Sequence, residues 1–308
     1  MKKLVLFLLL ICAVFAGSYS AARWKSTLQP HISGENAACD RFAPNPFPLQ
    51  NRPFAIVIIG RNHGASLEKT LASVFSQNYE NYRVVYIDDA SDDGSFDLAS
   101  DLIFDHCQSG HVTSVRNEQK LGKLANIARA VESCTNEEIV LVLDGEDWLA
   151  HEWVLQRLNS YYSDPDLWMA FSQTREYPFF QPAVCQIEPC LKDKKFRSDL
   201  VLSSQAFTFY AALFKKIHPS DFIFQGQYFP AGEDLAYTIP MLEMASEHVH
   251  LIPEVLTISN KQNSCVPEIP EILELQVQCE KWIRSLTPYP VISTLFLNDE
   301  WDELGEIR

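Results

Sequence analysis

The chain has 308 residues, of which 47% are hydrophobic and 21% are charged, a balance typical of a packed globular protein rather than a disordered one. Its 25 basic and 40 acidic side chains give a formal net charge of −15. Because this charge repels phosphate backbones, the composition excludes nucleic acid as an expected partner. The length suits one large α/β domain or two small ones.

The first 22 residues have the pattern of a targeting segment. Lys2 and Lys3 precede the uncharged run 4–22, as in a secretory signal peptide. Since about 20 apolar residues can also span a bilayer, an uncleaved signal anchor is the alternative, with membrane association through residues 4–22. Both interpretations predict a secretory or otherwise extracytoplasmic protein, which is secreted, luminal or held by this single segment. Residues 23–52 are polar and contain proline, which indicates a stem or linker.

Short apolar runs alternate with helical patterns after residue 53. Strands are expected at 54–59, 82–87, 112–115 and 139–143. Helices are expected near 67–75, 96–107 and 121–134. This alternation predicts an α/β fold with a doubly wound, mostly parallel sheet that carries helices on both faces.

The second half of the chain has a weaker pattern. A helix is expected over 206–217, with its aromatic side chains in the core rather than on a ligand platform. A second helix is expected over 234–246, and a peripheral one near 268–285. We therefore expect one domain over 53–260, with a nucleotide-binding half at 53–160 and a looser acceptor half at 161–260. Residues 261–308 would add the peripheral helix and an acidic tail.

Two acidic clusters follow predicted strands. Asp144, Glu146 and Asp147 place three carboxylates within four residues, and such oxygen ligands suit Mg²⁺ or Mn²⁺. A helix N-terminus, where acids interact favourably with the helix dipole, is the alternative. Asp88 and Asp89 follow an earlier strand and either accept hydrogen bonds from a ribose or base or cap a turn. Ligands of parallel sheets bind beyond the carboxyl ends of strands, and both clusters lie there.

Several segments resemble glycosyltransferase family 2, whose members have the GT-A fold. Val-Tyr-Ile-Asp-Asp-Ala-Ser-Asp-Asp-Gly-Ser at 85–95 is similar to the family's early acidic motif. Leu-Asp-Gly-Glu-Asp-Trp-Leu at 143–149 resembles its Asp-x-Asp segment, although Glu146 stands where Asp is usual. Further matches lie at 55–59, 71–79 and 117–126. The resemblance covers 54–160 closely and 200–260 more loosely.

The resemblance implies transfer of a sugar from a UDP- or GDP-sugar to a hydroxyl group of an unknown glycan, protein or lipid acceptor, with inversion at the anomeric carbon. The residues that it places at the nucleotide-sugar are Asn62, Asp88, Asp89, Lys123 and Asp144. Those that it places at a Mn²⁺ or Mg²⁺ ion on the diphosphate are Asp144, Glu146 and Asp147.

The acceptor hydroxyl also needs a base. Gly-Glu-Asp-Leu at 232–235 resembles a later Glu-Asp element of the family, in which Asp234 would accept the proton. Glu233 is the alternative base, and a non-catalytic acid in the first turn of a helix is the structural alternative. For the whole chain, the alternative is a degenerate, non-catalytic nucleotide-sugar-binding module or a secreted interaction scaffold.

Overall fold

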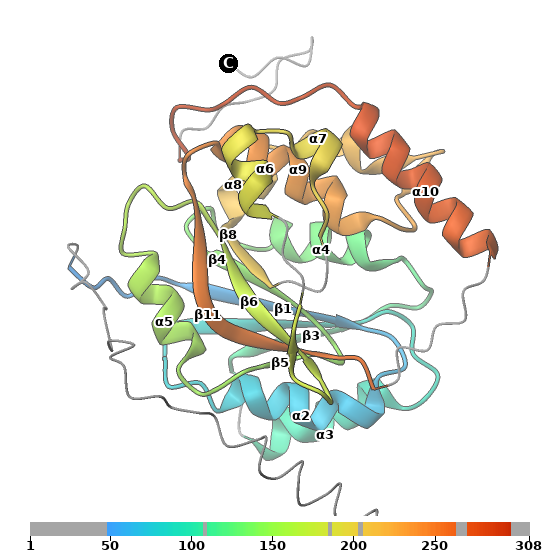
Figure 1. Cartoon of the computed structure of the whole chain (residues 1–308). Helices are drawn as coiled ribbons and strands as arrows, with labels where there is room; N and C mark the ends of the chain where they lie inside the picture. The colour runs from blue at the N-terminus through green and yellow to red at the C-terminus, as the bar shows by residue number, and fades with distance from the viewer. Residues whose placement is uncertain (1–47, 107–109, 184–186, 203–205, 263–269, 297–308) are drawn as a thin grey trace, which may run out of the picture. The chain divides into compact units, whose positions relative to one another are not determined.

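One curled sheet of nine strands organises the described part of the chain in its computed structural model (Figure 1). The structure describes residues 48–106, 110–183, 187–202, 206–262 and 270–296. They belong to one compact unit that begins at Phe47. The predicted targeting segment, nearly all of the predicted stem and the acidic tail lie outside the described residues, so the extracytoplasmic location stays a prediction. No helix that the structure describes is long and apolar enough to cross a membrane.

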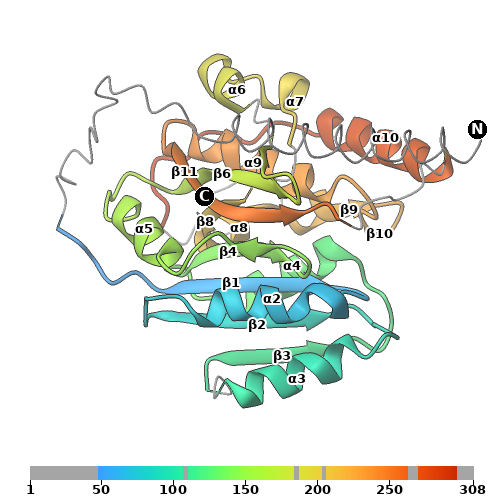
Figure 2. The same ribbon diagram turned by 60° about the horizontal axis from the view of Figure 1, so that its bottom comes forward.

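The first half of the sheet consists of parallel strands in the order β3-β2-β1-β4. These strands are β1 (Phe54–Gly60), β2 (Tyr82–Asp88), β3 (Val112–Arg116) and β4 (Ile139–Asp144). The helices between them are α2 (Gly64–Phe75), α3 (Ser95–Asp105) and α4 (Lys123–Glu132). Figure 1 shows α2 and α3 below the sheet and α4 above it, and Figure 2 shows the strands side by side. The elements predicted for this half are confirmed, with their ends shifted by a few residues.

Antiparallel pairs extend the sheet into the second half of the chain. The full order is β3-β2-β1-β4-β8-β6-β11-β5, and β7 pairs with β6. The added strands are β5 (Trp148–Leu149), β6 (Met169–Tyr177), β7 (Gln181–Pro182), β8 (Phe207–Tyr210) and β11 (Val249–Asn260), while β9 (Ile223–Phe224) and β10 (Gln227–Tyr228) form a separate pair. The added helices are α5 (Val154–Tyr161), α6 (Ile187–Asp193), α7 (Phe196–Asp199), α8 (Ala211–Lys215), a 3₁₀ turn (Pro219–Phe222), α9 (Glu233–Ala245) and α10 (Pro270–Ser285). One sheet therefore joins the two predicted halves.

The helix predicted over 206–217 is wrong in its first part. Phe207–Tyr210 forms strand β8, which lies antiparallel between β4 and β6, and only 211–215 is helical. All four residues of β8 are buried because both faces of the strand are covered. A short strand that is buried on both faces shows no alternation of apolar and polar residues. Its sequence pattern therefore cannot be distinguished from that of a buried helix. The expectation that its aromatic side chains belong to the core is confirmed.

The register of the parallel strands brings the acidic clusters to one edge. Gly60 at the end of β1 lies opposite Asp88 of β2, and the preceding Ile59 lies opposite Asp144 of β4. The carboxyl ends of these three strands therefore reach the same edge of the sheet. This is the edge at which doubly wound folds bind their ligands.

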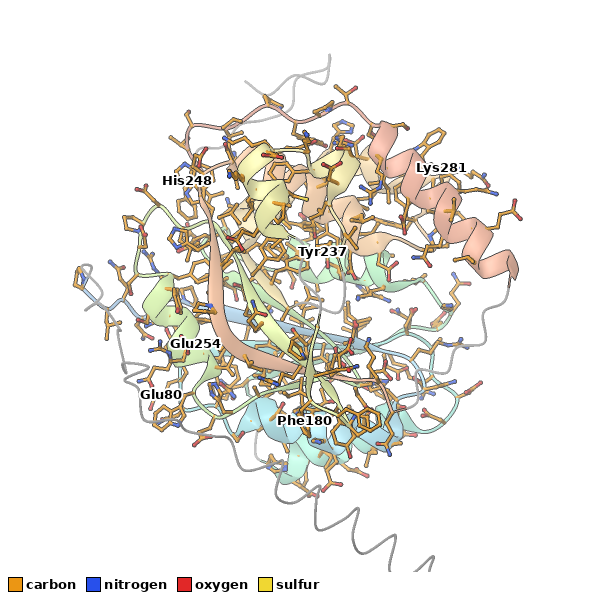
Figure 3. All side chains as sticks on the ribbon, viewed as in Figure 1. Glu80, Phe180, Tyr237, His248, Glu254 and Lys281 are labelled. Atoms are coloured by element: carbon orange, nitrogen blue, oxygen red, sulfur yellow. The ribbon has the colours of Figure 1, made fainter. Side chains whose placement is uncertain are left out.

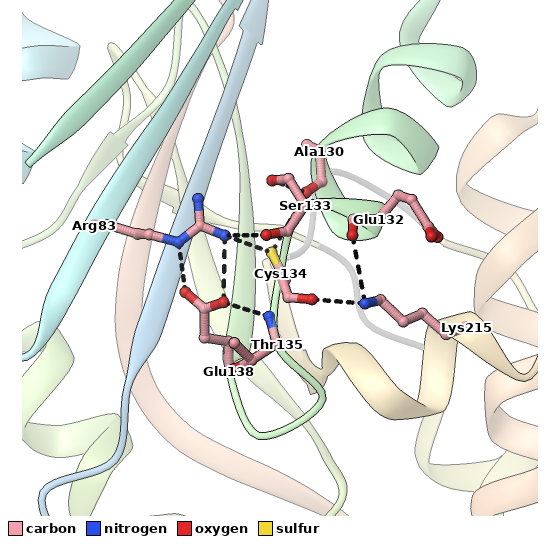
Figure 4. Close-up of polar contacts among 8 residues, drawn as sticks. All are labelled: Arg83, Ala130, Glu132, Ser133, Cys134, Thr135, Glu138 and Lys215. Carbon is pink, nitrogen blue, oxygen red and sulfur yellow. Dashed lines mark hydrogen bonds and ion pairs between the residues drawn. The ribbon is translucent and has the colours of Figure 1, made fainter. Parts of the chain in front are cut away.

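A polar cluster joins the same strands at their opposite ends (Figure 4). Arg83 of β2 donates hydrogen bonds to Glu138 Oε1 at 2.5 Å and to Cys134 Sγ at 3.2 Å. Lys215 of α8 donates to the carbonyl oxygen of Cys134 at 2.6 Å. The hydrogen bond with Glu138 raises the pKa of Arg83, so the guanidinium group stays charged. The cluster ties β2, β4 and two helices together away from the acidic edge and is structural.

Candidate active site

Four predicted site residues from distant parts of the chain line one pocket at the acidic edge. Lys123 begins α4, Asp144 ends β4, Asp147 follows three residues later, and Asp234 lies in the first turn of α9. The other lining residues are Val142, Leu143, Ala206, Phe207, Tyr237 and Thr257. The cavity has a volume of about 60 Å³ and is partly open to solvent. Residues predicted for the nucleotide-sugar, the metal and the base thus meet in one place.

Lys123 links two carboxylates of this pocket. Its Nζ lies 2.9 Å from Asp144 Oδ1 and 3.4 Å from Asp234 Oδ1. Burial lowers the pKa of Lys123, but Asp144 and Asp234 raise it more, so that it lies well above its ordinary value. The ammonium group therefore stays charged and holds the end of β4 beside the first turn of α9.

The loop after β4 concentrates negative charge in a partly buried place. Burial and the charge of Asp144 raise the pKa of Asp147 to about 7, although the backbone N–H of Asn260 donates a hydrogen bond to its Oδ1 at 2.8 Å. Burial and Asp144 also raise the pKa of Glu146, which is the more exposed of the two. Carboxylates that are costly to ionise for these reasons are stabilised by a bound cation.

These residues fit a divalent cation that a substrate helps to hold. No three His, Cys, Asp or Glu side chains of the described residues are grouped to hold an ion by themselves. Mg²⁺, however, is usually bound by one or two carboxylates together with the phosphates of its substrate. Asp144 and Asp147 both line the pocket, whereas Glu146 is exposed and is not among the lining residues. A site of two carboxylates and a diphosphate is therefore the arrangement that this chain can offer.

In the absence of metal, we expect the free energy of unfolding of Asp147→Asn, relative to that of the wild type, to increase as the pH rises from 5 to 8. The pKa of Asp147 in the folded protein, about 7, lies above the ordinary value of 3.8. Between these values the folded state binds the proton more tightly than the unfolded state, so the wild type loses stability as the pH rises. The asparagine buries no charge and keeps an oxygen for the hydrogen bond from Asn260. Thermal unfolding with a chelator present measures the difference.

The matched control for this experiment is Glu247→Gln, which removes an exposed carboxylate paired with Lys194. Its difference from the wild type is expected to be the same at pH 5 and pH 8. Mn²⁺ at pH 8 should stabilise the wild type more than Asp147→Asn, because the cation binds the deprotonated carboxylate. If Asp147→Asn differs from the wild type equally at both pH values, the carboxylate of Asp147 carries no burial cost.

Asp88 and Asp89 support the site and do not line this pocket. Asp88 is fully buried at the end of β2. Asp89 accepts hydrogen bonds from the backbone N–H groups of Leu121 and Gly122, each at 2.9 Å. Burial alone would raise the pKa of Asp89, but these and other hydrogen bonds outweigh it, and the pKa is lowered. Asp89 thereby fixes the turn that presents Lys123, and its contact with a base or ribose stays a prediction.

A second pocket lies beside these two acids. It is lined by Ala90, Ser91, Arg116, Asn117 and Glu118. Asn117 Nδ2 donates a hydrogen bond to Asp89 Oδ1 at 2.8 Å. The exposed Asn62 is tied to the same region, because its backbone N–H donates to Ser91 Oγ at 3.0 Å. Three residues predicted for the nucleotide, Asn62, Asp88 and Asp89, thus bond to residues that line this second pocket and line neither pocket themselves.

Two residues at or beside the site, His63 and Tyr237, were not predicted from the sequence. His63 is buried between the ends of β1 and β4, so closely that a Cβ on Gly60 or Gly145 would lie 2.3 or 2.6 Å from its ring. Burial lowers the pKa of His63, so the ring is neutral. Tyr237 donates a hydrogen bond from its hydroxyl group to Asp234 Oδ1 at 3.0 Å. The i, i+3 spacing of Asp234 and Tyr237 on a predicted helix was a usable signal for Tyr237, whereas no local pattern marks His63.

Comparison with known proteins identifies the family to which this chain belongs. The family model for glycosyl transferase family 2 matches residues 55–218. Because this match covers more than half of the chain, the chain belongs to glycosyltransferase family 2. A sequence comparison with curated proteins found no match.

Solved structures show that the fold is GT-A. S. aureus TarS in complex with UDP-GlcNAc is 15% identical and aligns over 69% of this chain and 59% of its own, with a TM-score of 0.55. The mannosyltransferase PcManGT from Pyrobaculum calidifontis, in complex with GDP-Man and Mn²⁺, is 18% identical over 79% of this chain and 69% of its own, with a TM-score of 0.57. GalNAc-T7 with UDP, GalNAc and Mn²⁺ is 14% identical and aligns over 75% of this chain and 48% of its own, with a TM-score of 0.52. The chain thus spans less than two thirds of TarS.

Proposed function

We propose that the chain transfers a sugar from a UDP- or GDP-sugar to a hydroxyl group of a glycan, protein or lipid acceptor, with Mn²⁺ or Mg²⁺ and with inversion of the anomeric carbon. The observation that carries this proposal is the meeting of Lys123, Asp144, Asp147 and Asp234 in one pocket. Membership of glycosyltransferase family 2 supports the reaction class. The TarS structure holds UDP-GlcNAc, and the PcManGT structure holds GDP-Man and Mn²⁺. Diphosphates of this kind suit a pocket with two acids and a lysine.

In the proposed reaction, Asp234 accepts the proton of the acceptor hydroxyl while the acceptor oxygen attacks the anomeric carbon. The bond from that carbon to the diphosphate oxygen breaks, and the nucleoside diphosphate leaves with the electron pair. A divalent cation held by Asp144, Asp147 and the diphosphate would act as a Lewis acid for this leaving group. Lys123 adds a fixed positive charge beside it. A single displacement assisted by a base inverts the configuration of the anomeric carbon.

Asp234 is preferred over Glu233 as the base because of its position. Both acids lie in the first turn of α9, but of the two only Asp234 lines the pocket that Asp144 and Asp147 also line. Burial raises the pKa of Glu233, and the nearby Lys123 lowers it only in part. The proposal therefore assigns the proton transfer to Asp234.

Calorimetric titration of the full chain with UDP and with GDP, each with and without Mn²⁺, tests the donor site. We expect one nucleotide to bind, and to bind more tightly with Mn²⁺. Release of UDP from UDP-GlcNAc, or of GDP from GDP-mannose, then tests catalysis. Binding without turnover would favour the non-catalytic binding module, and no binding of either nucleotide would favour the interaction scaffold.

A further inference from the structure

Tyr237 holds the proposed base from within α9, where Figure 3 shows it between the helix and the sheet. Its hydroxyl group donates a hydrogen bond to Asp234 Oδ1 at 3.0 Å. The two residues are three positions apart, so their side chains lie on the same side of the helix. The ring is 1% exposed and packs against Phe207 and Phe214, with ring centroids 5.5 and 5.7 Å apart. Such close packing keeps the hydroxyl group directed at Asp234.

The two oxygens of Asp234 have different surroundings. Oδ1 accepts the hydrogen bond from Tyr237 and lies 3.4 Å from Lys123 Nζ. Among the described residues, no hydrogen bond is donated to Oδ2, and the side chain is 44% exposed. Burial and the charge of Asp234 raise the pKa of Tyr237 well above its ordinary value, so the phenol stays a donor. One oxygen is therefore held by the protein, and the other is available to a substrate.

We propose that Tyr237 is a positioning residue that turns Oδ2 of Asp234 toward the acceptor hydroxyl. This inference rests on the proposed function. The acceptor proton moves to Oδ2, the acceptor oxygen bonds to the anomeric carbon, and the diphosphate oxygen leaves with the bonding electrons, while Tyr237 keeps its own proton. A carboxylate that is already oriented needs no rotamer search, and a misplacement of about 1 Å costs on the order of 100-fold in rate.

Tyr237→Phe tests this inference, because it keeps the buried ring and removes only the hydroxyl group. Release of nucleoside diphosphate is measured against donor concentration, with UDP-GlcNAc or GDP-mannose as the donor and water as the acceptor hydroxyl. We expect kcat to fall about tenfold, while the donor KM and the Kd for the nucleoside diphosphate change by less than about twofold. The matched control is Tyr162→Phe, which removes a buried hydroxyl that bonds Thr208 Oγ1 at 2.9 Å and should leave kcat unchanged.

The outcomes separate this inference from the proposed function. If the wild type turns over a donor and Tyr237→Phe has the same kcat, the inference is overturned and the proposed function stands. A donor KM that rises in Tyr237→Phe would overturn it too, because the residue would then serve donor binding. An equal loss of kcat in Tyr162→Phe would assign the effect to core packing. No turnover of either donor by the wild type would overturn the proposed function and the inference together.

Discussion

Asp234→Asn is expected to reduce glycosyl transfer by about 100- to 10,000-fold and to leave the affinity for the nucleoside diphosphate unchanged. The amide group cannot accept the proton of the acceptor hydroxyl. Its oxygen still accepts the hydrogen bond that Tyr237 donates to Asp234 Oδ1 in the wild type, and Lys123 keeps its ion pair with Asp144 although its pairing with residue 234 is lost. Asp144 and Asp147, the carboxylates proposed for the diphosphate-bound cation, are not altered. Release of UDP or GDP measures turnover, and calorimetry measures affinity.

Glu233→Gln is the matched control, because it neutralises the neighbouring acid in the same helical turn. It is expected to keep most of the activity, since Glu233 is not among the residues that line the pocket. The reverse result, an active Asp234→Asn and an inactive Glu233→Gln, would assign the base to Glu233. Loss of nucleotide binding in Asp234→Asn would show that Asp234 supports the donor.

Gly145→Ala is expected to destabilise the protein by about 1–3 kcal/mol and to abolish metal-assisted nucleotide binding. The added Cβ would lie 2.6 Å from Cδ2 of the buried His63. The backbone of Gly145 has little freedom to move away, because its N–H donates to the carbonyl of Ile59 at 2.8 Å and its carbonyl accepts from Thr70 Oγ1 at 3.1 Å. Any relief of the clash must displace the loop that carries Asp144. Urea unfolding and calorimetry measure the two effects.

Gly110→Ala is the matched control, because a Cβ there meets no atom within 4 Å. Its stability should stay within about 0.5 kcal/mol of the wild type. The double variant His63→Ala, Gly145→Ala should be less destabilised than the sum of the two single variants, since His63→Ala removes the ring that the added Cβ of Ala would meet. A Gly145→Ala protein with wild-type stability and nucleotide binding would show that the loop adapts without cost.

The first half of the fold could be predicted because its signals are local. The runs 54–59 and 139–143 are almost wholly apolar, as strands covered by helices on both faces must be, and the helices between the strands repeat apolar residues at helical spacing. The parallel pairing that follows from this alternation also predicted that Asp88 and Asp144 end strands at one edge of the sheet.

The second half could not be predicted equally well because its structure depends on distant partners. Phe207–Tyr210 becomes a strand because β4 and β6 lie on either side of it in the sheet. Both strands precede it in the sequence: β8 begins 63 residues after the end of β4 and 30 after the end of β6 (207 − 144 = 63; 207 − 177 = 30). Its own composition fits a helix or a strand. The confinement of His63 by two glycines likewise depends on how β1 and β4 are paired.

Local periodicity and short motifs encode the family, the GT-A fold of the first half and the acids that carry the proposed chemistry, so these features could be predicted from the sequence. How those acids are used depends on the tertiary structure. It separated Asp89, which fixes a turn, from Asp144 and Asp234, which meet at Lys123, and it placed the hydroxyl of Tyr237 on the proposed base. These contacts join residues brought together by strand register and helix packing, and interactions between charges depend on distances that no local pattern contains.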